Sequence, residues 1–143
     1  MQDKGILRVI DANYNRFKEG LRVAEDIFRF VLEDDLCREK IRALRHGFDD
    51  IVKENFLKDG ILTRDSDSDL GRNTDSLELR RDNVFDLVYI NLQRAKESLR
   101  VLEELFKIVL PAKVSQLKSM RYQIYTLEKE ILVAYPEKFK IKQ

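Results

Sequence analysis

Two arginines of this 143-residue chain, Arg16 and Arg94, lie where a helix would turn them toward its apolar side. Each follows an asparagine by three residues, Asn13 in the first case and Asn91 in the second. An inward guanidinium must be paired, because an unpaired charge is very costly in a protein interior. The spacing therefore predicts either an anion-binding site or an internal network of arginines and carboxylates.

Two further arginines, Arg45 and Arg121, occupy matching places at the edges of two other apolar stripes. The planar guanidinium suits phosphate oxygens, so these side chains could extend a phosphate-binding cluster. The alternative is an edge arginine whose stem packs while its charged head reaches solvent. His46 is a candidate general base only because it neighbours Arg45.

A long polar segment in the middle of the chain carries alternating aspartates at Asp65, Asp67 and Asp69. This resembles the start of a calcium loop, but the positions that need Gly and Glu carry Leu70 and Ser76, which excludes an EF-hand. The segment could still fold over a phosphate and hold Mg²⁺ through one or two carboxylates. A flexible solvated linker is the alternative.

The elements that must position these residues are helices. Apolar residues recur in steps of four and three, which predicts helices over 8–33 and 36–58, a third that includes 88–109, and a fourth that includes 117–134. Gly60 is the expected stop of the second helix. With five Gly, two Pro and no hairpin-turn signal, the chain is predicted to be all-α.

An internal repeat organises these helices. Residues 13–32 shifted by 78 positions match residues 91–110 with 11 identities in 20, and a shift of 76 places the second helix on the fourth. We therefore expect the full 143 residues to form a single domain, a four-helix bundle made of two duplicated helical hairpins with a long crossover. The repeat units are predicted to be 8–58 and 86–135, and the crossover loop 61–82.

A charged row on the first helix is predicted to be a solvated face with ion pairs three and four residues apart. The repeated parts of this row could instead form an interface or line an active site. The row comprises Lys18, Glu19, Arg22, Glu25, Asp26 and Arg29.

Composition excludes several classes of protein. The formal net charge of +1 lacks the electrostatic footprint of a nucleic-acid or anionic-membrane binder. No apolar run approaches the length of a membrane span, and no leader segment is expected. One cysteine, Cys37, cannot form an internal disulfide, and with one histidine it cannot make a Cys/His zinc site. A reducing, cytoplasmic location is expected.

Several motifs together resemble a known family. They are the segment 11–26, Leu44-Arg45-His46, Arg64-Asp65 with Asp69-Leu70-Gly71, the segment 91–104, and the segment 121–128. In this order, across about residues 8 to 131, they resemble the helical domain found ahead of the barrel in some bacterial thiamine-phosphate synthases. That domain, fused or stand-alone, is understood to be a hydroxymethylpyrimidine phosphate kinase.

The resemblance implies an ATP-dependent phosphotransferase of thiamine biosynthesis. It would phosphorylate 4-amino-5-hydroxymethyl-2-methylpyrimidine phosphate to the diphosphate, with Mg²⁺ and ATP. The arginines would contact phosphates, the asparagines the aminopyrimidine edge, and Tyr14 or Tyr122 the ring. The predicted catalytic residues are Arg64, Asp65 and His46. The metal ligands are Asp65 and Asp69. The substrate-binding residues are Asn13, Arg16, Glu19, Arg45, Asn91, Arg94, Arg121 and Tyr122.

Two other classes of function stay open at this level. A non-catalytic module could bind a pyrimidine phosphate or dock a thiamine-phosphate synthase barrel, and a structural helical homodimer would do neither. This chain lacks the (β/α)₈ barrel, so the resemblance does not imply synthase activity for it. The expected partners are small molecules, with a homodimer and a synthase barrel as further candidates.

Overall fold

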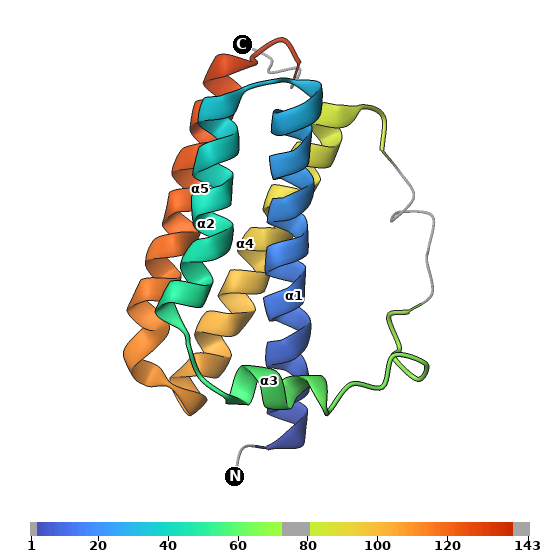
Figure 1. The fold of residues 1–143 in the computed structure, drawn as a ribbon, viewed down its shortest axis with the longest axis vertical. Helices are drawn as coiled ribbons and strands as arrows, with labels where there is room; N and C mark the ends of the chain where they lie inside the picture. Colours follow the sequence, from blue (N-terminus) through green and yellow to red (C-terminus); the bar gives the residue numbers. More distant parts are fainter. Residues whose placement is uncertain (1–2, 73–80, 139–143) are drawn as a thin grey trace.

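The computed structural model describes residues 3–72 and 81–138, and the predicted all-α class is confirmed for them. Within those ranges all regular secondary structure is helical, and four long helices lie side by side (Figure 1). None of the described helices combines the length and apolar character of a membrane-spanning segment. The long helices are α1 (Lys4–Asp26), α2 (Asp35–Ile51), α4 (Val84–Val109) and α5 (Val114–Ala134); shorter elements are η1 (Ile27–Val31), α3 (Phe56–Ile61) and η2 (Pro111–Lys113).

The core runs along the middle of the four long helices. Helix α1 packs against α2 and α4, and α5 packs against α4 and α2. Phe48 of α2 contacts Phe17 of α1 and Phe106 of α4, with ring centroids 5.7 and 6.4 Å apart. These three rings are fully buried and belong to the apolar stripes that the sequence predicts.

The connection between α1 and α2 is short and is formed by a π-helical turn, a left-handed residue and a helix cap. The last turn of the first helix widens into the π-helical segment η1, where the Leu32 amide donates to the Ile27 carbonyl at 3.0 Å. Glu33 then adopts a left-handed conformation with φ of 51°. Asp34 caps α2 by accepting from the Cys37 amide, so the chain reverses direction within a few residues.

The second helix ends at Ile51, so the prediction that it continues to residue 58 is wrong. Val52 is extended and buried, and the chain then forms the short helix α3, which packs on α1. Gly60 does not end a helix in a left-handed conformation. It lies so close to α1 that an added Cβ would stand 3.0 Å from the Asp11 Cβ and 3.3 Å from the Leu7 carbonyl oxygen. Gly60 therefore permits close helix packing.

The crossover begins after α3 and reaches α4 at Val84. Its residues 64–72 are exposed. Residues 73–80 of the predicted crossover lie outside the described residues, as do 1–2 and 139–143 of the predicted domain.

Candidate functional site

Matching residues of the two repeats face each other across α1 and α4. They line a groove of about 760 Å³, called here the central groove. The two helices approach closely beneath this groove: a Cβ added to Gly20 would stand only 2.8 Å from the Asn91 carbonyl oxygen. Ser98 takes the place of Gly20 in the second repeat and donates to the Arg94 carbonyl at 2.7 Å. The repeated lining residues are Asn13, Arg16 and Glu19 of α1 with Asn91, Arg94 and Glu97 of α4.

The two asparagines of the central groove are buried and oriented in the same way. Asn13 donates through Nδ2 to the Val9 carbonyl at 2.9 Å, and Asn91 donates to the Leu87 carbonyl at 2.8 Å. Neither side-chain oxygen accepts a hydrogen bond from another described residue. Each amide therefore has its donor end fixed by its own helix and an acceptor available to a ligand.

Arg16 and Arg94 lie at the edge of the central groove, and both are exposed, so the expectation that they face inward is wrong. Their long side chains reach solvent from positions beside the apolar row. Neither guanidinium has a carboxylate within ion-pair distance among the residues that the structure describes. The sequence leaves two alternatives for these arginines, an anion-binding site or an internal network with carboxylates. No such network is present in the described part of the chain, so both cations are available to an anion.

A second groove of about 670 Å³, called here the loop groove, joins α1 to the crossover. Asn13, Arg16 and Glu19 line this groove as well as the central groove, so the two grooves are neighbours. Arg64, Asp65 and Asp69 contribute from the loop side. The structure thus places three predicted crossover residues beside the predicted residues of α1.

Asp11 fixes the start of the loop and was not among the candidates from the sequence. Its buried carboxylate accepts two hydrogen bonds from Arg64, Nε to Oδ2 at 2.6 Å and Nη2 to Oδ1 at 2.8 Å. Hydrogen bonding to Asp11 raises the pKa of the Arg64 guanidinium. The repeat gives no signal for Asp11, because Tyr89 occupies the matching position.

Asp65 and Asp69, the predicted metal ligands, are exposed on the loop groove. Their Oδ1 atoms accept from loop amides, Ser68 at 3.2 Å and Gly71 at 2.9 Å. No group of three acidic, histidine or cysteine side chains is arranged for a metal among the described residues. Mg²⁺ commonly binds one or two carboxylates together with substrate phosphates and water, and the two aspartates fit that mode rather than an all-protein cage.

Arg45 and Arg121 each pair with a buried carboxylate. The sequence allows such a network for the two arginines of the central groove, but it is found at this second pair of arginines. Arg45 binds Glu25, and Arg121 binds Glu103 through Nε at 2.5 Å and Nη2 at 3.1 Å. Hydrogen bonding to Glu103 raises the pKa of Arg121. Glu25 is 2% exposed, so its assignment to a solvated face is wrong. Helix α2 covers it and supplies its counter-ion.

The remaining candidates lie apart from the central and loop grooves. His46 lines a separate pocket with Arg45. Tyr122 is exposed on α5, with its ring 5.3 Å from that of Tyr125. Tyr14 is half-buried and donates to Asp49 at 2.8 Å, so its ring is not presented to either groove. The sequence-predicted residues therefore do not form one site: most lie on the two neighbouring grooves, and the others lie in the pocket of His46 and Arg45, on α5, and beside Asp49.

Comparison with known proteins identifies the group to which this arrangement belongs. The ThiD2 family model matches residues 8–130, which include the central groove, nearly all of the loop groove and most of both repeats. The chain belongs to the ThiD2 family. No solved structure matches it.

Curated relatives carry the name thiamine-phosphate synthase. The chain is 38% identical over 128 residues to the protein from Synechocystis sp. (strain ATCC 27184 / PCC 6803 / Kazusa), covering 89% of this chain and 36% of that protein. It is 30% identical over 131 residues to the one from Rhodopirellula baltica (strain DSM 10527 / NCIMB 13988 / SH1), covering 91% of this chain and 35% of that protein. The chain thus spans little more than a third of the length of these relatives.

Proposed function

We propose that this chain is a kinase of thiamine biosynthesis that transfers the γ-phosphoryl group of ATP to hydroxymethylpyrimidine phosphate. Membership of the ThiD2 family and the names of the relatives support a place in that pathway. The observation that carries the kinase proposal is the central groove. It combines two exposed arginines that have no carboxylate partner in the described residues with two buried asparagines whose amide oxygens are available.

Each half of this arrangement suits one part of a pyrimidine phosphate. An aminopyrimidine donates from its exocyclic amine, and an asparagine side-chain oxygen accepts such a bond. An arginine provides a charge-assisted, two-pronged contact to phosphate oxygens. Asn13 and Arg16, and likewise Asn91 and Arg94, are one helical turn apart, so each pair can contact the two ends of one small molecule.

The transfer itself asks little covalent chemistry of the protein. A phosphate oxygen of the pyrimidine phosphate attacks the γ-phosphorus, the bond to the β–γ bridging oxygen breaks, and ADP leaves with that electron pair. Phosphate is largely ionised near pH 7, so this nucleophile needs no general base, and His46 is not required in that role. Catalysis depends on positioning and on cations around the transferred group. Arg16 and Arg94 are the proposed cations, and Arg64, whose charge is paired with Asp11, would contribute a weaker one.

Asp65 and Asp69 are the residues that would hold Mg²⁺ on the loop groove. The ion would neutralise charge on the nucleotide phosphates. Because the loop groove shares Arg16 with the central groove, a nucleotide held at the loop would lie beside a pyrimidine phosphate in the central groove. In this proposal the two substrates occupy two neighbouring grooves.

Phosphorus NMR tests the proposal directly. Purified protein is given Mg-ATP and hydroxymethylpyrimidine phosphate, and the spectrum is followed for the paired resonances of a pyrimidine diphosphate. Appearance of that product together with ADP supports the kinase. A raised melting temperature with the pyrimidine phosphate, but no diphosphate product, would instead support a non-catalytic binding or docking module. This module is the second candidate because the chain matches only about a third of each synthase relative.

A further inference from the structure

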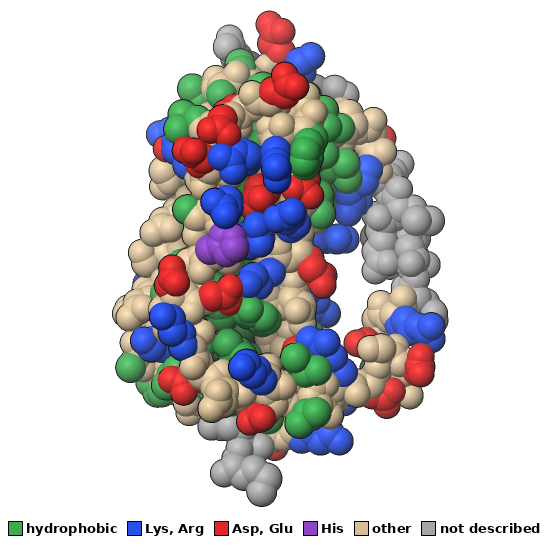
Figure 2. Space-filling model, viewed as in Figure 1, with side chains coloured by type: hydrophobic (Ala, Val, Ile, Leu, Met, Phe, Trp, Pro, Cys, Tyr) green, Lys and Arg blue, Asp and Glu red, His purple; other side chains and the backbone are tan. Residues whose placement is uncertain are grey.

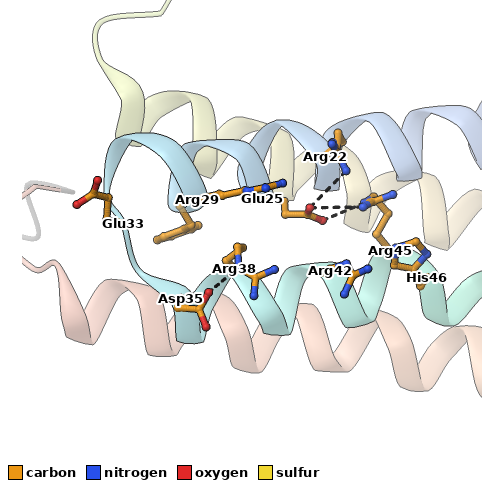
Figure 3. Close-up of a pocket in the computed structure, with 10 residues that line it drawn as sticks. Arg22, Glu25, Arg29, Glu33, Asp35, Arg38, Arg42, Arg45 and His46 are labelled. Carbon is orange, nitrogen blue, oxygen red and sulfur yellow. Dashed lines mark hydrogen bonds and ion pairs between the residues drawn. The ribbon is translucent and has the colours of Figure 1, made fainter.

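A separate group of arginines lies on a different face of α1, where α1 and η1 meet α2. Figure 3 shows these side chains around a pocket of about 840 Å³, called here the arginine pocket. In Figure 2 blue side chains gather beside the purple His46, the one histidine of the chain. The positively charged lining residues are Arg22, Arg29, Arg38, Arg42 and Arg45, against the carboxylates of Glu25, Glu33 and Asp35.

The carboxylates do not account for all of this positive charge. Glu25 is bound by both Arg22 and Arg45, and Arg38 binds Asp35 at 2.7 Å. Arg42 is exposed and has no carboxylate within ion-pair distance among the described residues.

Arg29 lies in η1, directly after α1. Its guanidinium carbon stands 4.7 Å from the centre of the Phe30 ring, and no described carboxylate pairs with it. Together with Arg42 it gives the pocket an uncompensated positive charge that faces solvent.

Comparison of the two repeats shows which of these side chains are shared by both helical hairpins. The buried pair of Arg45 and Glu25 recurs in the second half as Arg121 and Glu103. Arg38 and His46 do not recur, since by the shift of 76 they correspond to Val114 and Tyr122, whereas Arg42 corresponds to another cation, Lys118. Since the second hairpin folds with Val114 in the place of Arg38, an arginine at this position is not required to hold a hairpin together.

We propose that the arginine pocket binds a small molecule through its diphosphate or triphosphate group. From Arg38 to His46 the row on α2 rises by roughly 12 Å, which is long enough for several phosphates to be contacted in turn. Arginine forks bind such oxygens through charge-assisted hydrogen bonds. In Figure 3 Arg38 and Arg42 project from α2 toward the side of α1, and a concave site between two helices suits a small anion better than a flat protein surface does.

This site is independent of the proposed kinase activity, since neither groove is lined by any of its residues. The single histidine provides a probe of the pocket. In ¹⁵N-labelled protein His46 gives one set of side-chain resonances, which report an anion bound beside it. Inorganic pyrophosphate, inorganic triphosphate and ATP are titrated in separate arms, each without Mg²⁺.

We expect pyrophosphate and triphosphate to shift the His46 resonances saturably, and Arg42→Gln to weaken this binding about tenfold. Lys118→Gln, the matching change in the second repeat, should leave the affinity unchanged. Tighter binding of ATP than of triphosphate would support the site and add recognition of the nucleoside, and equal affinities would support recognition of the phosphates alone.

Saturable pyrophosphate binding that leaves His46 unshifted, or that Arg42→Gln does not weaken, would overturn the proposal. Absence of any pyrophosphate or triphosphate binding would also overturn it, and so would binding of a polyglutamate peptide at His46 without binding of either phosphate. Because Arg42 is exposed and has no ion-pair partner in the described part of the chain, its replacement is not expected to unfold the protein. Melting temperatures of both variants check this.

Discussion

Arg45 of α2 binds the buried Glu25 of α1 through two hydrogen bonds, Nε to Oε1 at 3.0 Å and Nη2 to Oε2 at 3.4 Å. The same arrangement joins α5 to α4 in the second repeat, between Arg121 and Glu103. Both carboxylates are 2% exposed and both arginine side chains 13% exposed. The duplication therefore preserves one buried ion pair in each helical hairpin.

Removing an arginine of these pairs should destabilise the fold. Arg45→Ala leaves Arg22 as the one described cation within ion-pair distance of the buried Glu25 carboxylate, at 3.4 Å, and we expect the free energy of unfolding to fall by about 3 kcal/mol. Urea unfolding measures this. Arg42→Ala, one helical turn away and exposed, is the control and should change stability by less than about 0.5 kcal/mol. Equal effects of the two changes would show that the buried pair has no special role.

The close approach of α1 and α4 makes Gly20 intolerant of a side chain. In Gly20→Ala the new Cβ would stand 2.8 Å from the Asn91 carbonyl oxygen, and backbone cannot easily yield. We expect a net loss of about 1 to 3 kcal/mol despite the better helix propensity of alanine. Gly47→Ala is the matched change within a helix: its Cβ would meet only the flexible Met120 Cε at 3.6 Å, and it should stabilise by about 0.5 to 1 kcal/mol. Thermal melts that rank the two variants the other way would contradict the packing seen under the groove.

Alkaline pH should destabilise the protein through Cys37. Burial, and then the nearby Asp34, raises the pKa of the Cys37 thiol to about 12, against about 8.5 in an unfolded chain. A raised pKa favours the protonated thiol in the folded state, so stability should fall as the pH rises from about 8.5 toward 12. Urea unfolding at several pH values measures the slope, which Cys37→Ala should reduce. An unchanged slope in that variant would exclude the thiol as its source.

The proposed kinase activity should fall when either arginine of the central groove is replaced by an uncharged residue. Arg16→Gln and Arg94→Gln each remove one cation from the proposed phosphate contacts, and we expect kcat/KM for the pyrimidine phosphate to fall at least about tenfold. Both side chains are exposed, so melting temperatures should not change. Lys118→Gln serves as the charge-matched control. Full activity in both arginine variants would place the substrate elsewhere.

Apolar spacing is sufficient to predict the all-α class, because each long helix buries residues three and four apart, such as Phe17, Leu21, Ala24 and Phe28. The burial of Glu25 cannot be predicted in this way. On an isolated helix it lies opposite the apolar stripe, and only the packing of α2 with Arg45 covers it.

The end of α2 also depends on tertiary contacts. Residues 52–55 contain no Gly or Pro, and the chain leaves the helix there so that α3 can pack on α1. Within the candidate site, the repeat marks the residues of the central groove, since Asn13 and Arg16 recur as Asn91 and Arg94. It gives no signal for Asp11, which has no counterpart.

The loop groove makes Asp65 the residue on which the kinase proposal can be tested most sharply. Asp65 lines the groove, and within the described ranges its carboxylate accepts a single hydrogen bond, from the Ser68 amide of its own loop. Asp67, two residues on, is not among the groove-lining residues and is 95% exposed. Asp65→Ala and Asp67→Ala therefore remove the same charge from the same loop, inside and outside the groove.

The decisive measurement is ADP release from Mg-ATP, with and without hydroxymethylpyrimidine phosphate, for the wild-type protein and these two variants. We expect release that requires the pyrimidine phosphate, is abolished in Asp65→Ala and persists in Asp67→Ala, with all three melting temperatures alike. No pyrimidine-dependent release by the wild-type protein would contradict the kinase function, and full activity in Asp65→Ala would contradict the placement of its site at the loop groove.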